Sequence, residues 1–154
     1  MKTPKWAKNF VQDALVFLEE QGYKVTVPTI KWRYHAGHNS SGRASGWALG
    51  EQSIIISAGK SRLDTKLVIL HELAHTVTEP RPVYRNIERA KKNCEPDQSI
   101  VIKTICHTPE FWDTAWKLYR WAKLPIRYCQ QRECSYRAGA QIAYKQSRRA
   151  SKHS

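Results

Sequence analysis

The segment His71-Glu72-Leu73-Ala74-His75 contains the residues of this chain best suited to catalytic chemistry. Two histidines four residues apart lie on nearly the same side of a helix, because four residues advance it by about 400°. Both imidazoles can then reach one zinc ion, which accepts nitrogen ligands at about 2.0–2.1 Å. Glu72 is offset from both ligands, so its carboxylate can take a proton from a zinc-bound water. The segment predicts a zinc hydrolase with His71 and His75 as ligands and Glu72 as general base.

A catalytic zinc site also needs a third protein ligand, while a water fills its fourth position. His107 is our first choice, because it directly precedes Thr108, the expected cap of the next helix, where a side chain can be held rigidly. Glu110 is the alternative, as in sites built from two histidines and one glutamate. Three further side chains of ligating type remain as candidates: Glu79, His35 and His38.

The helices that must position these residues are indicated by apolar periodicity. Ser61 or Asp64 can cap a helix that runs to about residue 78 and carries the two histidines. This helix is apolar nearly all round, which is typical of the centre of a domain. An amphipathic helix is predicted for residues 4–21, and a last helix begins at Thr108 and ends before Pro125.

The segments between these helices indicate short strands. Residues 29–34 alternate between apolar and polar, and residues 43–49 and 52–57 are predicted to form a hairpin around Gly50-Glu51. Residues 99–105 indicate a further strand, and residues 35–42 a mobile loop. We therefore predict an α+β fold in which a small antiparallel sheet of about three strands packs with the three helices. Residues 1–144 would form this single domain, and residues 145–154 a basic, flexible tail.

The chain is strongly basic, with 26 Lys and Arg against 13 Asp and Glu, a net charge of +13. Such a charge favours polyanions, so we expect DNA as a candidate partner. No stretch approaches the roughly 20 apolar residues that span a bilayer, and no signal peptide is visible, so we expect a cytoplasmic protein without membrane contact. The spacing of the four cysteines does not match a zinc ribbon, although a disulfide between Cys94 and Cys106 stays open for an exported protein.

The order of these segments along the chain resembles the order found in the SprT-like zinc metallopeptidases. The similarity lies in HELAH on a buried helix, followed by His107-Thr108-Pro109-Glu110-Phe111 at the start of the next helix. The resemblance implies a zincin-like fold, with His71, His75 and His107 as zinc ligands and Glu72 as general base. It also implies that residues 52–57 form the sheet edge along which a substrate peptide lies. The chain lacks the family's zinc ribbon, and so is similar to small metallohydrolases of bacteria and their phages.

The predicted reaction is hydrolysis of a peptide bond by a zinc-bound water that Glu72 activates, with DNA-associated proteins among the candidate substrates. A separate group must stabilise the oxyanion, and the spacing does not select between Tyr34, His38 and Tyr84. Two alternatives remain open. One is a basic nucleic-acid-binding protein whose zinc is structural or non-catalytic, and the other is a zinc hydrolase of a non-peptide amide.

Overall fold

The computed structural model of the chain describes residues 1–45, 51–86, 99–134, 141, 145–146 and 149, with backbone alone at residues 83–86 and 99–103. Helices and strands alternate irregularly along the chain, in the order α1 (Lys5–Glu20), β1 (Thr29–Tyr34), β2 (Ser41–Ser45), β3 (Ser53–Ala58), α2 (Arg62–Val77), β4 (Arg81–Asn86), β5 (Ser99–Ile105), α3 (Pro109–Trp121) and α4 (Ile126–Cys134). The fold is α+β, as the sequence predicts.

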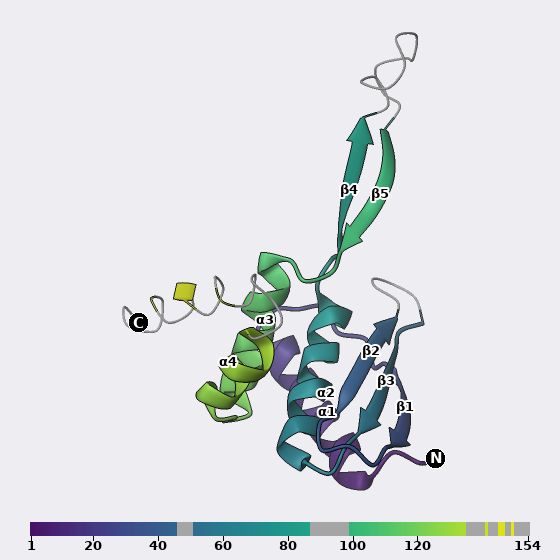
Figure 1. Ribbon diagram of the computed structural model, residues 1–154, viewed down its shortest axis with the longest axis vertical. Coiled ribbons are helices and arrows are strands. Elements are labelled where there is room, and N and C mark those ends of the chain that lie inside the picture. Colours follow the sequence, from purple (N-terminus) through teal and green to yellow (C-terminus); the bar gives the residue numbers. More distant parts are fainter. Residues whose placement is uncertain (46–50, 87–98, 135–140, 142–144, 147–148, 150–154) are drawn as a thin grey trace.

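Strands β1, β2 and β3 form a mixed sheet in the order β1-β3-β2 (Figure 1). The prediction of an antiparallel sheet is correct for β2 and β3 but wrong for β1, which runs parallel to β3. The reason is the connection from β1, which crosses the end of β3 so that β2 lies on its far side. Ser45 pairs with Ser53, and this register is not the one that a two-residue turn at Gly50-Glu51 would produce.

The crossing segment, residues 35–40, passes close over the start of the next helix. Gly59 permits this passage, because a Cβ there would lie 2.6 Å from the carbonyl oxygen of His38 and 2.7 Å from that of Asn39. The Ser61 amide donates to the carbonyl of His38 at 3.2 Å. The segment predicted to be a mobile loop is therefore anchored by its backbone to the beginning of α2.

Helix α2 lies at the centre of the molecule, between the sheet and α3 (Figure 1). Ser61 is its cap, since the Ser61 hydroxyl accepts a hydrogen bond from the Asp64 amide at 3.2 Å. The predicted central position is confirmed by six buried apolar side chains spread around the helix: Leu67, Val68, Ile69, Leu70, Leu73 and Ala74. The alternating residues Ile54, Ile56 and Ala58 of β3 are buried in the same core.

Helix α1 packs on α2 and was predicted within one residue at each end. Gly22 follows it at φ 90°, the left-handed conformation in which glycine is favoured because it has no Cβ. Near the other end of the helix, the Trp6 ring meets the Trp32 ring of β1 edge-on, with centroids 5.9 Å apart. Helix α2 packs on β2 and β3, while α1 reaches β1 through this ring contact.

Strands β4 and β5 form an antiparallel pair that projects from the rest of the molecule (Figure 1). The strand predicted at residues 99–105 is confirmed, whereas β4 was not predicted. Its second residue, Pro82, has no N–H for a ladder and makes such a segment a poor candidate for a strand. The chain enters β4 shortly after the end of α2, and β5 leads it back to His107, just before α3.

Helix α3 begins as the sequence predicts, with Pro109 in its first turn and the Thr108 hydroxyl accepting from the Phe111 amide at 3.1 Å. It ends at Trp121, and a turn with Lys123 at φ 56° leads into α4. Helix α4 was not predicted, because it has no apolar stripe: its three buried residues are two cysteines and a glutamate.

No helix in the described part of the chain is both long and apolar enough to cross a membrane. The predicted tail, residues 145–154, lies mostly outside the described residues.

Candidate metal centre

Two histidines of α2 and one histidine from the segment before α3 converge on one point. His71 and His75 are one turn apart on α2, and His107 stands at the entrance to α3. The Nε2 atom of His107 lies 3.2 Å from Nε2 of His71 and 3.2 Å from Nε2 of His75. Among the described residues, these three form the one group of metal-ligating type that is close enough together to hold a metal ion. The structure therefore brings His107, the first choice for the third ligand, together with His71 and His75.

Aromatic side chains of α3 hold the three imidazoles in place. The His75 ring stacks on Phe111, with centroids 4.1 Å apart, and the His107 ring stacks on Trp112 at 5.5 Å. His71 meets the edges of the same two aromatic rings. Phe111 and Trp112 are almost completely buried, so the wall behind the histidines is rigid.

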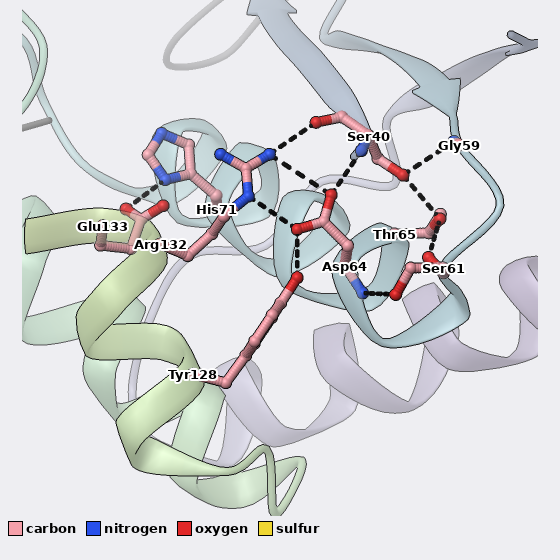
Figure 2. Close-up of polar contacts among 9 residues, drawn as sticks. All are labelled: Ser40, Gly59, Ser61, Asp64, Thr65, His71, Tyr128, Arg132 and Glu133. Atoms are coloured by element: carbon pink, nitrogen blue, oxygen red, sulfur yellow. Dashed lines mark hydrogen bonds and ion pairs between the residues drawn. The ribbon is translucent and has the colours of Figure 1, made fainter. Parts of the chain in front are cut away.

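His71 is also held by an acidic residue from α4. Its Nδ1 atom lies 2.9 Å from Oε2 of Glu133, and both side chains are buried (Figure 2). A carboxylate only accepts hydrogen bonds, so Nδ1 carries the proton and donates it. In neutral imidazole the lone pair is then on Nε2, the atom that faces the other two histidines. Glu133 thus fixes the tautomer that a metal ligand requires.

The donor set fits a metal ion better than it fits hydrogen bonds between the rings. One N–H on His107 Nε2 can serve one of its two neighbours but not both. Two nitrogens bound to one tetrahedral zinc are about 3.3–3.4 Å apart, given bonds of about 2.0–2.1 Å. The separations of 3.2 Å are close to this value. A single ion would satisfy all three nitrogens at once.

Glu72 lies beside the triad, buried under strand β2. A Cβ added to Gly42 would lie 2.7 Å from Cγ of Glu72 and 2.8 Å from Cγ1 of Val68. Gly42 is in the inward row of the sheet, next to Ile56. Only glycine therefore lets β2 approach α2 this closely, and that approach confines the Glu72 side chain.

The triad opens into a cleft of about 420 Å³. One wall is the strand β2, and the other is the segment that follows α2 together with the segment that follows β5. The residues around the cleft are Gly42, Arg43, Ala44, His71, Glu72, His75, Thr78, Pro80, Cys106 and His107. The resemblance placed the sheet edge at residues 52–57, which is wrong: β3 is the middle strand, and β2 is the edge beside the cleft.

The other ligand candidates do not join the triad. Glu110 is exposed, and its carboxylate pairs with Arg81 at 3.3 Å. The His35 ring accepts from the Gly37 amide at 2.9 Å, outside the cleft. His38 belongs to the crossing segment, and Glu79 lines a different hollow beside α3.

The candidates for oxyanion stabilisation are not found at the cleft either. Tyr34 is 56% exposed and lies at the end of β1, where its ring contacts Trp32. His38 does not line the cleft, and the side chain of Tyr84 lies outside the described residues.

Three cysteines are free thiols, and Cys94 lies outside the described residues. Cys106 is exposed at the cleft, next to His107. Cys129 is fully buried in α4, where burial and the nearby Glu133 carboxylate raise its pKa to about 12. Cys129 is therefore an unreactive packing residue rather than a nucleophile.

Comparison of the chain with protein-family models, with curated proteins and with solved structures gave no match.

Proposed function

We propose that this protein is a zinc-dependent metallopeptidase with a zincin-like active site. The observation that carries the proposal is the convergence of three histidine Nε2 atoms directly beside the buried Glu72, at a cleft bordered by a strand edge. Three histidines with an open fourth position are a common arrangement for catalytic zinc. A purely structural site has no use for a buried carboxylate next to the ligands.

The strand edge is the reason for proposing a peptide substrate rather than another amide. In the described part of the chain β2 pairs only with β3, so its outer edge presents backbone N–H and C=O groups along the cleft. An extended peptide can add to such an edge through backbone hydrogen bonds, with little dependence on its sequence. The edge would hold the scissile bond in front of the triad.

A zinc ion held by His71, His75 and His107 would polarise the substrate carbonyl and acidify a water beside it. Glu72 would accept the proton of the attacking water and pass it to the leaving nitrogen. The stacked aromatic rings and Glu133 keep the histidines in position during these proton transfers. The resemblance to SprT-like metallopeptidases, stated above on sequence motifs, is part of the same proposal.

Removal of the metal tests the proposal. The purified protein is expected to bind about one zinc per chain and to cleave an unfolded protein such as reduced casein. A chelator should lower the cleavage rate by at least about 100-fold, and added zinc should restore it. Metal content by mass spectrometry and cleavage by gel densitometry check both expectations.

A protein that binds no zinc would contradict the proposed metal centre. A protein that binds zinc in the triad and cleaves no unfolded protein would contradict the peptidase proposal and favour a non-peptide substrate. Addition of double-stranded DNA to the same assay tests whether a polyanion that binds the basic chain, with its net charge of +13, changes the cleavage rate.

The close packing at Gly42 gives a second expected result. In Gly42→Ala the new Cβ would displace Glu72 or push β2 outward, because the contact with Glu72 Cγ would be only 2.7 Å. The cleavage rate should fall about 100-fold, since displacement of a catalytic group by about 1 Å has this effect. Zinc content should stay unchanged, because the nearest contacts of the added Cβ would be with Glu72 and Val68 rather than with the histidines.

Gly37→Ala is the matched control for this variant. Its Cβ would also make a 2.7 Å contact, but with the exposed His35 ring, which can rotate away. Equal cleavage rates for Gly42→Ala and Gly37→Ala would refute the role of Gly42.

A further inference from the structure

The carboxylate of Asp64 is completely buried and accepts hydrogen bonds from three residues, two of α4 and one of the segment before β2 (Figure 2). Its Oδ1 atom accepts from Nε of Arg132 at 2.7 Å and from the Tyr128 hydroxyl. Its Oδ2 atom accepts from the Ser40 amide and from Nη2 of Arg132 at 3.3 Å. Both oxygens of the carboxylate are therefore fully used, and they join α2, α4 and the segment before β2.

The contacts of Asp64 with Ser40, Tyr128 and Arg132 form a junction of three segments. Arg132 adds a further hydrogen bond to this junction. Its Nη2 atom also donates to the Ser40 carbonyl at 2.8 Å, so the Asp64–Arg132 pair holds both backbone groups of Ser40. The Ser40 hydroxyl in turn contacts Thr65 at 2.7 Å and accepts from the Gly59 amide at 2.9 Å. Ser40 is consequently fixed, two residues before Gly42.

Both ends of this junction lead to the metal centre. Arg132 is followed directly by Glu133, the residue that accepts from His71. Ser40 leads directly into β2, the strand that confines Glu72 and borders the cleft. A change at Asp64 or Arg132 would therefore reach the site along two separate routes.

The ion pair in this junction is by itself weak evidence for a stabilising role. Burial alone would raise the pKa of the Asp64 carboxyl, but hydrogen bonds from Arg132, Tyr128 and the Ser40 amide leave the pKa lowered. The carboxylate thus stays ionised, and a buried ion pair often stabilises a fold no more than apolar residues of the same volume. The planar guanidinium of Arg132 instead fixes the relative position of the segments that it joins.

Helix α4 depends on contacts of this kind for its position. It has nine residues, shorter than the roughly 12–15 that an isolated helix needs, and its buried residues are two cysteines and Glu133. Cys129 and Cys134 pack in the core, and the bonds from Tyr128 and Arg132 add directional contacts that set the rotation of the helix about its axis. Glu133 must nevertheless be placed within hydrogen-bond distance of one ring nitrogen.

We propose that Asp64 and Arg132 are positioning residues for the metal centre, forming a clamp that sets Glu133 against His71 and β2 against Glu72. This inference depends on the proposed metal centre and adds residues that do not touch the metal or the substrate. The clamp acts on metal affinity through α4 and on peptide binding through β2.

Zinc affinity, measured by competition with a chromophoric chelator, tests the α4 route. Arg132→Gln is expected to raise the dissociation constant for zinc about 10- to 100-fold, the usual effect of losing an outer partner of a ligand. Arg127→Gln is the matched control, because the same exchange is made on the same helix at an exposed position. It should leave the constant unchanged.

A double-variant cycle separates positioning from general loosening. If the clamp acts on the metal through Glu133, Arg132→Gln should change zinc affinity by less than about twofold in a Glu133→Gln background. The inference would be overturned if the fold-changes of the two single variants in the dissociation constant for zinc multiply in the double variant. It would also be overturned if folded Arg132→Gln has an unchanged dissociation constant for zinc. Wild-type protein that binds no zinc would instead defeat the proposed function.

Two further readouts complete the test. Should Arg132→Gln fail to fold, Arg132→Lys keeps the charge beside Asp64 but loses the fork, and an increase in the zinc constant of about fivefold is expected. An unchanged constant there would overturn the inference. For the β2 route, Arg132→Gln should raise KM for a peptide substrate several-fold at saturating zinc while Arg127→Gln does not. An unchanged KM in folded Arg132→Gln would refute this route.

Discussion

Glu72→Gln is expected to retain its zinc and to lose about 10²- to 10⁴-fold in the rate of peptide cleavage. The glutamine is nearly isosteric and fits under β2 as the glutamate does, so the cleft should keep its shape. It cannot accept the proton of the attacking water, and loss of a general base has an effect of this size. Single-turnover cleavage of casein, with zinc content measured on the same sample, checks the prediction.

Glu110→Gln is the control for this experiment. It makes the same chemical change at an exposed position that the metal centre does not include. Its cleavage rate should equal that of the wild type. A Glu72→Gln protein that retains more than about a tenth of the wild-type rate would show that another group is the base. Loss of zinc from Glu72→Gln would mean that Glu72 is needed to hold the metal, which is not the proposed role.

The parts of the site that could be predicted from the sequence are those that local patterns specify. The spacing of His71 and His75 places both imidazoles on one side of a helix, and the cap at Thr108 explains why His107 is held rigidly. Each of these features depends on a few neighbouring residues. The predicted bounds of α2, with Ser61 as cap, and the start of α3 are correct within about two residues for the same reason, whereas α3 ends at Trp121, earlier than the limit predicted at Pro125.

The parts that could not be predicted depend on contacts between distant residues. Glu133 and His71 are separated by 62 positions, and nothing in the pattern around Glu133 indicates a buried helix. Asp64 was recognised as a candidate cap, but its carboxylate is used instead by Arg132 and Tyr128, far along the chain. A buried acidic residue with distant basic partners leaves no periodic signal in a sequence.

The sheet order illustrates the same limit. The alternation in β1 correctly predicts a strand, but alternation does not specify the direction of its neighbour. The crossing at Gly59 decides the order, because it takes the chain past the end of β3 before β2 begins. The consequence for function is direct: β2, and not β3, becomes the edge at the cleft.

His107→Ala is expected to have the second large effect, a rise of roughly 10²- to 10³-fold in the dissociation constant for zinc. Structural zinc sites with four ligands bind with roughly 10–16 kcal/mol, so the loss of one ligand removes several kcal/mol. The fold should survive, because His107 is half-buried and precedes α3, whose cap is Thr108. Chelator competition gives the constant, and circular dichroism checks the fold.

Glu110→Ala tests the first alternative to His107 as third ligand that the sequence left open. Glu110 is three residues beyond His107, in the first turn of α3, but its carboxylate pairs with Arg81 away from the triad. Its removal should therefore leave zinc affinity unchanged within about twofold. A loss of affinity in Glu110→Ala as large as in His107→Ala would mean that the carboxylate moves into the site when the metal binds. The 3.2 Å contacts of His107 with both other imidazoles argue that the three nitrogens are already placed for the ion, with no need for a fourth protein ligand.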